Sequence, residues 1–245
     1  MGVLQFDDLS TLWYMIKFNT RTPAQFECKA AYADVPAPWE ESTHPGLLLA
    51  SAQGYGEMVA RQVEAWKGSV VGDGECWTLA HEALVHVNQS QGYSGDVKMF
   101  ESVGRTHGHL VYRCVPGAAQ WRGGDEGNIR RGDIVEWEHS QCKTADGGTA
   151  TMGNPSGGMP DHTAVVVDVQ IDESKAANDP ARFKALAVLE QSAGQPVHQT
   201  TFDVSKLVSG GFWVFRPVGS VALLEGKAEP KWEDAETRRG WEALN

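Results

Sequence analysis

The chain has 245 residues and a formal net charge of −11, from 21 lysines and arginines against 32 aspartates and glutamates. This acidic balance argues against a nucleic-acid-binding protein, because such proteins present a basic surface to the phosphate backbone. The apolar runs are far shorter than the roughly 20 residues that a helix needs to cross a bilayer. We therefore expect no membrane span.

Four cysteines at irregular spacing, without a Cys-x-x-Cys motif, are too few for a disulfide framework. The first residues contain neither the basic region nor the small-residue cleavage site of a secretory signal peptide, so we expect none. These features favour a reducing, cytoplasmic environment.

The first 46 residues join an aromatic-rich stretch, residues 12–18, to a proline-rich stretch, residues 23–45. The prolines make a long helix unfavourable near the end of this segment. We predict that residues 1–46 form an arm packed on the body of the protein. Trp39 is the expected anchor, because a large aromatic side chain buries the most area.

Residues 47–67 are predicted to form an amphipathic helix, since apolar side chains recur there at spacings of three and four. Gly68 ends this helix. The turn-rich segment Gly72-Asp73-Gly74-Glu75 then leads into a second helix over residues 76–88. Its apolar side chains occupy so much of the helix surface that we expect it to be buried on most sides.

The pattern changes after residue 100 to short β-branched and aromatic runs that predict strands. These runs are residues 110–114, 133–137, 163–169, 185–191 and 212–215. Glycines and prolines over residues 140–160 indicate a long mobile loop and a candidate lid. Helices followed by strands predict one α+β domain over residues 47–220, with a polar tail at 221–245.

Cys76 stands out among the cysteines because it begins a predicted helix after a glycine-containing turn. The partial positive charge and exposed N–H groups of a helix N-terminus stabilise a thiolate and can hold an oxyanion. A buried structural cysteine is the alternative interpretation.

A cysteine nucleophile needs a base, and His162 is the best candidate because it begins a buried strand directly after the glycine-rich loop. A third group should orient its ring. Glu190 and Gln191 both end the next strand, and side-chain alternation sends them to opposite faces, so only one can reach His162. Glu190 is the first choice, because a charged residue that ends an apolar strand otherwise costs free energy.

Four segments in this order resemble the signatures of papain-fold cysteine hydrolases, best matched by their NlpC/P60 and CHAP branch. The segments are Gly72-Asp73-Gly74-Glu75-Cys76-Trp77, Arg131-Gly132-Asp133-Ile134-Val135-Glu136-Trp137, Asp161-His162-Thr163-Ala164-Val165-Val166 and Leu189-Glu190-Gln191-Ser192. This resemblance implies a helix bearing the cysteine packed on an antiparallel sheet.

The resemblance also implies roles for individual residues. Cys76 would be the nucleophile, His162 the general base and acid, and Glu190 the orienting group, with Gln191 as the alternative third residue. The backbone N–H groups of Cys76 and Trp77 would hold the oxyanion. The implied reaction is acyl transfer from a peptide or amide substrate through a thioester, without a cofactor.

A second resemblance covers the whole chain, including the Trp39 segment and the closing Phe215-Arg216-Pro217. The chain is similar to the C-terminal domain of fungal actin-patch proteins that contain SH3 domains and bind the tail region of type I myosin. This likeness implies a cytoplasmic, cortical location and cytoskeletal protein partners. It leaves open a catalytically silent interaction module of the same fold.

A metal site is the weaker alternative. His81 and His86 resemble the histidines of a zinc-binding helix, but they are five residues apart where that motif needs four. Each residue of a helix turns by about 100°, so the two rings point far apart and cannot share one ion. We therefore predict no metal ligands.

Overall fold

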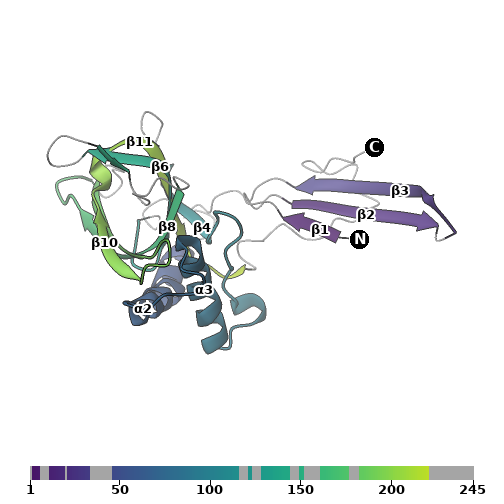
Figure 1. The fold of residues 1–245 in the computed structure, drawn as a ribbon, viewed down its shortest axis with the longest axis horizontal. Coiled ribbons are helices and arrows are strands. Elements are labelled where there is room, and N and C mark those ends of the chain that lie inside the picture. The colour runs from purple at the N-terminus through teal and green to yellow at the C-terminus, as the bar shows by residue number, and fades with distance from the viewer. Residues whose placement is uncertain are drawn as a thin grey trace. The chain divides into compact units, whose positions relative to one another are not determined.

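A computed structural model describes residues 2–5, 11–19, 21–33, 46–115, 121–122, 128–143, 149–151, 161–176 and 182–220. The chain divides into two compact units. One holds the N-terminal strands with the short segment Val103–Thr106, and the other holds the remaining helices and strands (Figure 1). Each unit is described by itself.

The N-terminal unit contains a three-stranded antiparallel sheet of β1 (Gly2–Gln5), β2 (Thr11–Asn19) and β3 (Thr22–Ala33), in that order. We expected an arm here and did not predict the sheet. Pro23 lies in β3, and an edge strand is where a sheet tolerates proline. Packing of residues 1–46 on the body stays a prediction, and residues 34–45, with Trp39, lie outside the described residues.

The predicted first helix is confirmed as three consecutive helical segments. They are α1 (Leu47–Ser51), a π-helical turn (Ala52–Gly56) and α2 (Glu57–Ala65). A Cβ atom on Gly132, which has a φ of 85°, would lie 1.8 Å from the carbonyl oxygen of Gly56. Glycine at position 132 therefore lets this helix approach the sheet closely.

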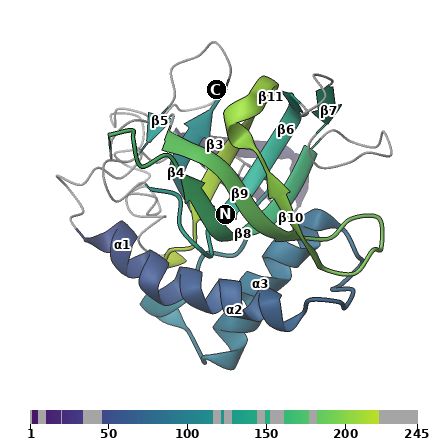
Figure 2. The same cartoon turned by 90° about the vertical axis from the view of Figure 1, so that its left-hand side faces the viewer.

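The second predicted helix is α3 (Cys76–Ser90), and its boundaries match the expectation within two residues. Figure 2 shows α2 and α3 beside each other below the sheet. Their apolar side chains form one buried cluster with three strands of the sheet, and its members include Val59, Val63, Leu79, Ala80, Leu84, Ile134, Val165 and Leu189. This cluster fixes the N-terminus of α3 against the sheet.

The second unit is built on an eight-stranded sheet in which all described pairings are antiparallel. The strand order is β10-β9-β8-β6-β11-β4-β5, with β7 paired to β6. The bounds are β4 His109–Cys114, β5 Trp121–Arg122, β6 Ile134–Lys143, β7 Thr149–Thr151, β8 Asp161–Ile171, β9 Phe183–Glu190, β10 His198–Phe202 and β11 Leu207–Arg216. Short 3₁₀ turns occupy Gly95–Val97 and Val204–Lys206.

Five of these strands were predicted, and the α+β class with helices packed on an antiparallel sheet is confirmed. The expected loop over residues 140–160 is wrong in part, because β6 continues to Lys143 and pairs with β7. Residues 144–148 and 152–160 lie outside the described residues, so the lid stays a prediction. Among the described residues, no helix is long and apolar enough to cross a membrane.

The sheet curls strongly. The ring of Tyr112 in β4 lies 5.1 Å from that of Phe183 in β9, although three strands separate β4 from β9 in the sheet order. One face of the sheet carries the α2–α3 cluster. The other face encloses aromatic side chains, among them Trp137 and Phe202, whose ring centroids lie 4.8 Å apart.

Asp133 and Arg216 form a fully buried ion pair beside this core. The Arg216 guanidinium donates through Nε and Nη2 to the two carboxylate oxygens of Asp133, each at 2.9 Å. It also donates to the carbonyl oxygens of Leu48 and Asn128. The Gly132-Asp133 motif is therefore structural here, since it ties the last strand to the start of α1 and of β6.

Candidate active site

Cys76 is the first residue of α3, and the loop before it sets the start of the helix. The backbone N–H of Glu75 donates to Asp73 Oδ1 at 3.1 Å, and the Asp73 carboxylate also accepts a hydrogen bond from Thr78. A Cβ atom on Gly74, at a φ of 85°, would lie 2.6 Å from Gly194 Cα. Glycine is required there because the loop lies directly against the segment that follows β9.

Gln191 is fully buried and holds this same loop. Its Oε1 accepts from the backbone N–H of Val71 at 3.0 Å, and its Nε2 donates to the carbonyl oxygens of Val71 at 2.7 Å and Glu75 at 3.1 Å. Gln191 therefore links the end of β9 to the residue that caps α3. The structure does not place it on His162.

His162 and Glu190 lie together, both buried, at the start of β8 and the end of β9. The Nε2 atom of His162 is hydrogen-bonded to Glu190 Oε2. This contact leaves Nδ1 of the ring for the Cys76 thiol, to which His162 is also hydrogen-bonded. The backbone N–H of Thr163 is a second donor to the sulfur.

Alternation along β9 explains why Glu190 and Gln191 reach different partners. Leu189 belongs to the cluster packed on α3, and Gln191 lies two residues further on the same side. Glu190 points to the opposite face. There the ring of His162 also stacks on Trp137, with centroids 5.9 Å apart and an interplanar angle of 26°.

Burial opposes ionisation of Cys76 and is the largest single influence on it. The hydrogen bond and charge of His162, with the Thr163 N–H, nevertheless hold the pKa of the thiol below its ordinary value. Burial also opposes a charged His162, but the contacts with Cys76 and Glu190 raise its pKa to about 9. The arrangement therefore favours a thiolate–imidazolium pair.

Glu190 completes the electrostatic arrangement. Burial raises its pKa, but hydrogen bonds from His162 and Thr200, with the charges of His162 and His198, bring the net shift below the ordinary value. An ionised Glu190 can only accept hydrogen bonds, so it fixes the proton of His162 on Nε2. This is the geometry that a Cys–His nucleophile with an orienting carboxylate requires.

Trp77 follows Cys76 in the first turn of α3. Glu75, the residue that caps this turn, makes no side-chain hydrogen bond to it. The indole of Trp77 stacks on His81, with centroids 4.7 Å apart and rings 13° from parallel. The expected oxyanion role of the Trp77 N–H stays a prediction.

Sequence reasoning did not single out Trp137 or Glu136 as parts of the site. Both lie in the predicted strand over residues 133–137, where alternation gave no sign that they flank His162 and Thr163. In the structure they pair with those two residues across β6 and β8. The burial of Glu136, which makes a hydrogen-bond partner necessary, is visible only in the structure.

A group of possible metal ligands lies near the start of β8. Glu138, His139 and Asp161 each place one ligand atom within 4.8 Å of the others. The group differs from the histidine pair that we considered in the sequence. We assign it no function.

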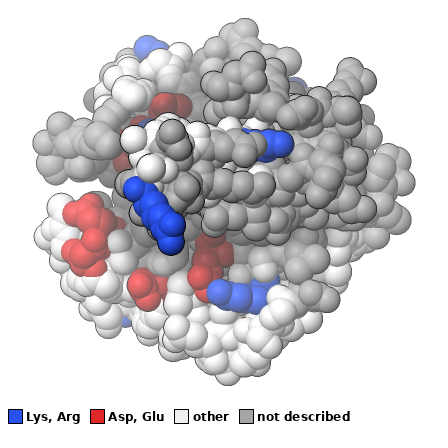
Figure 3. All heavy atoms as spheres, turned by 90° about the vertical axis from the view of Figure 1, so that its right-hand side faces the viewer, with Lys and Arg blue, Asp and Glu red and all other residues white. Residues whose placement is uncertain are grey.

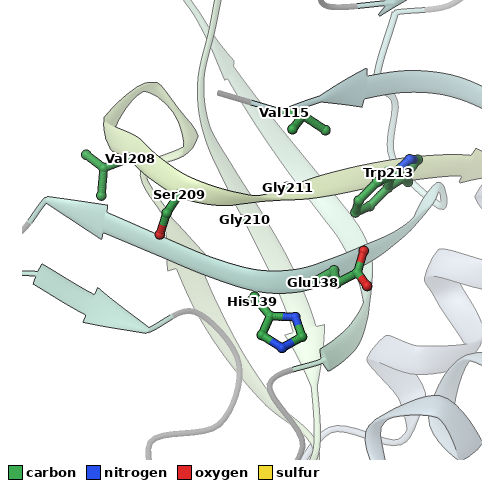
Figure 4. A pocket seen from close by; sticks show the side chains of 8 residues that line it. All are labelled: Val115, Glu138, His139, Val208, Ser209, Gly210, Gly211 and Trp213. Atoms are coloured by element: carbon green, nitrogen blue, oxygen red, sulfur yellow. The ribbon is translucent and has the colours of Figure 1, made fainter. Parts of the chain in front are cut away.

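A surface groove of about 600 Å³ runs beside Glu138 and His139 (Figure 4). It is lined by Val115, Glu138, His139, Val208, Ser209, Gly210, Gly211 and Trp213. Cys76, His162 and Glu190 are not among its lining residues, so this groove is separate from the site. In the view of Figure 3, the lysines and arginines of the described residues form no continuous basic patch, in keeping with the acidic net charge.

The model of the AIM3/BBC1 cysteine proteinase-fold domain matches residues 31–227, most of the chain. The chain belongs to this family. Altered inheritance of mitochondria protein 3 of Debaryomyces hansenii is 35% identical over 129 residues, which are 49% of this chain and 12% of that protein. The chain thus matches only a small part of that relative's length. No solved structure matches the chain.

Family membership confirms the expected resemblance to the fungal cysteine-proteinase-like domain. It shows the fold of a cysteine proteinase.

Proposed function

We propose that this domain is a cysteine-dependent hydrolase of amide or peptide bonds. The observation that carries the proposal is the placement of the half-buried Cys76 thiol, at a helix N-terminus, against a histidine that is itself held by a buried carboxylate. Cys76 is the nucleophile, His162 the general acid and base, and Glu190 the orienting group.

The reaction has two steps. The Cys76 thiolate attacks the substrate carbonyl carbon and forms a C–S bond, while the Nδ1 proton of His162 passes to the leaving amine as the C–N bond breaks. Water, deprotonated by the now neutral His162, then attacks the thioester and releases the acid and the thiolate. The N–H groups of Cys76 and Trp77 stabilise the oxyanion in both steps.

Within the cysteine proteinase fold, we propose the NlpC/P60 or CHAP type, from the order of the four sequence signatures. We also propose cytoskeletal protein partners and a cytoplasmic, cortical location, from the likeness to domains of actin-patch proteins. Both statements rest on resemblance.

Alkylation tests the nucleophile directly. The native protein is treated with iodoacetamide from pH 4 to 9, and the modification of each cysteine is followed by peptide mass spectrometry. Cys76 should react at pH 6 faster than the exposed Cys28, because its pKa is lowered. The buried Cys142 should stay unmodified, because burial and the charges of Asp203 and Cys114 raise its pKa to about 11.

The variant His162→Ala is the control, and it should slow the reaction of Cys76 at pH 6 by about tenfold, since an adjacent opposite charge shifts a pKa by 1–3 units and each unit slows the reaction by roughly threefold after the gain in nucleophilicity. A screen of peptide and amide substrates follows, with Cys76→Ala as the blank. If Cys76 stays inert until the protein unfolds, the proposal is wrong.

The second candidate is a catalytically silent interaction module of the same fold. The observation in its favour is that His162 and Glu190 are almost completely buried, at 2% and 6% exposure. Inert Cys76 in the alkylation experiment would support this candidate.

A further inference from the structure

A second buried polar array lies behind Cys76. The Ser102 hydroxyl is 2.7 Å from Nδ1 of His107, and Nε2 of His107 is 2.6 Å from Oε1 of Glu136. The same oxygen of Glu136 accepts a hydrogen bond from the Thr163 hydroxyl. All four side chains are buried, with His107 fully so. The mechanism proposed above uses none of these side chains.

Burying Glu136 costs free energy, which its contacts must offset. An ionised carboxylate removed from water is expensive unless it is paired and hydrogen-bonded, and replacing such a group by an apolar one is often neutral or stabilising. Here His107 and Thr163 hold the carboxylate in one place. An ionised carboxylate accepts only, so Nε2 of His107 carries the proton in this contact.

The array leads directly to the nucleophile. Glu136 in β6 pairs with Thr163 in β8, and Thr163 follows His162. The Thr163 hydroxyl donates to Glu136, while its backbone N–H donates to Cys76 Sγ. One residue thus contacts both the buried carboxylate and the sulfur.

Glu136 also lies on the face that carries α3. Ile134 and Val165 belong to the cluster packed on that helix, and Glu136 and Thr163 are two residues away from them along the same strands. Among the described residues, the titratable groups that act on the sulfur include His162, which is hydrogen-bonded to Glu190, and Glu136, which is hydrogen-bonded to His107.

We propose that Glu136, held by His107, Ser102 and Thr163, is a positioning residue of the site: it fixes a negative charge behind Cys76 that keeps the thiolate basic and therefore nucleophilic. This inference rests on the proposed function, since it assigns a group that tunes the same nucleophile.

The charges act in opposite directions on the thiol. Burial is the main influence that raises the pKa of Cys76, His162 lowers it, and the charge of Glu136 raises it. A thiolate loses intrinsic nucleophilicity as its pKa falls, by roughly threefold per unit for a Brønsted coefficient of about 0.4–0.5. Glu136 therefore limits the loss of nucleophilicity that the His162 contact brings.

The test is the pH profile of Cys76 alkylation in the variant Glu136→Gln, which keeps the shape and an acceptor oxygen for Thr163 but removes the charge. The thiol pKa should fall, because the variant loses the negative charge that raises it. The curves of variant and wild type should cross. The variant should react faster at pH values below the pKa and more slowly on the alkaline plateau, by roughly threefold in each direction for every unit by which the pKa falls.

Glu138→Gln is the matched control, because Glu138 lies in the same strand two residues away and lines the groove of Figure 4. Its profile should coincide with that of the wild type. A folded Glu136→Gln protein with an unchanged profile would overturn the inference and leave the proposed function intact. An ordinary thiol pKa in the wild type would refute the proposed function, and the difference between the two proteins would still test Glu136.

If circular dichroism shows that Glu136→Gln does not fold, Thr163→Val decides. Valine keeps the β-branched shape and the backbone N–H, and it removes only the hydroxyl that anchors Glu136. The thiol pKa should then fall by a smaller amount, because Glu136 keeps its charge but is no longer held against Thr163, the residue that contacts the sulfur. An unchanged profile in that variant would contradict the inference.

Discussion

Two buried histidine–glutamate pairs occupy opposite faces of one curled sheet. His162–Glu190 lies on the face that carries Trp137, and His107–Glu136 lies on the face packed against α3. In each pair, Nε2 of the histidine contacts the carboxylate. The pairs differ in what the other ring nitrogen faces, because that of His162 meets the half-buried Cys76 thiol and that of His107 meets the buried Ser102 hydroxyl.

This difference shows that the residue pair alone does not define a catalytic base. A histidine oriented by a carboxylate becomes one only when its free nitrogen faces a group that can react and that substrate can reach. The His107 pair has the same hydrogen bonds in a closed setting. The His107 pair therefore has a structural and electrostatic role, whereas the His162 pair can exchange a proton with a nucleophile.

The strongest way to test this contrast is to remove each histidine in turn. His107→Ala should lower the free energy of unfolding by about 3 kcal/mol, because it leaves the buried Glu136 carboxylate without its hydrogen bond from His107. His162→Ala should cost less, because Glu190 keeps its hydrogen bond with Thr200 and the nearby charge of His198. Urea unfolding monitored by fluorescence gives both values.

Reactivity should show the opposite order. Alkylation of Cys76 at pH 6 should fall by about tenfold in His162→Ala and change by no more than about threefold in His107→Ala. Equal losses of stability and reactivity in the two variants would mean that the pairs do not have separate roles.

The next largest expected effect is that of replacing Gln191, the residue that follows Glu190. Gln191→Ala should lower the free energy of unfolding by about 2 kcal/mol, because it leaves the buried N–H of Val71 without its partner and takes one of two donors from the Val71 carbonyl oxygen, which keeps the N–H of Gly74. It should also slow Cys76, since the loop that starts α3 loses its anchor at Glu75. Unfolding and alkylation of the same preparation test both effects.

Gln191→Glu separates the effect of the hydrogen bonds that residue 191 donates from the effect of burying its side chain. A glutamate still accepts from Val71 N–H but, when ionised, cannot donate to the two carbonyl oxygens. Its stability should therefore fall as well, with the loss diminishing at acidic pH where the side chain is protonated. A pH-independent loss would show that the carbonyl contacts contribute little.

Much of the first pair could be predicted from sequence, because local rules define its residues. Apolar periodicity placed Cys76 at a helix start, and the β-branched run after His162 placed that residue at a strand start. Alternation separated Glu190 from Gln191. Which of the two meets His162 depends on the register of β8 with β9, where Val165 pairs with Leu189, and one strand alone does not reveal this register.

The second pair could not be predicted, because it is held by contacts between distant segments. His107 lies in an irregular segment before β4, 29 residues from Glu136. Glu136 occupies a position in a predicted strand where alternation alone is equally compatible with solvent exposure.

The three-stranded N-terminal sheet was not predicted for a different reason. Prolines in the first 46 residues outweighed the strand-forming aromatic residues of β2 in our interpretation.

The smallest expected effect is the pH dependence of stability, which tests the contact between Cys76 and His162. Its sign follows from the pKa shifts of these two residues. His162 has a pKa raised from 6.5 to about 9, so its contribution is fully present below pH 6.5 and is lost as the pH rises through 9. Cys76 has a pKa lowered from 9.0, so its contribution is present above that value and is lost as the pH falls through the lowered pKa. Between pH 6.5 and 9 the two trends oppose each other.

The wild-type free energy of unfolding should therefore change little between pH 6.5 and 9 on account of this pair. Cys76→Ser removes the titrating thiol, while Glu190 still raises the pKa of His162. The stability of the variant should then decline as the pH rises above 6.5, and the decline should end at or below pH 9. Urea midpoints measured at half-unit pH steps give the slope. A variant curve parallel to that of the wild type would mean that Cys76 and His162 do not share a proton, so the comparison of the two pairs would lose its basis.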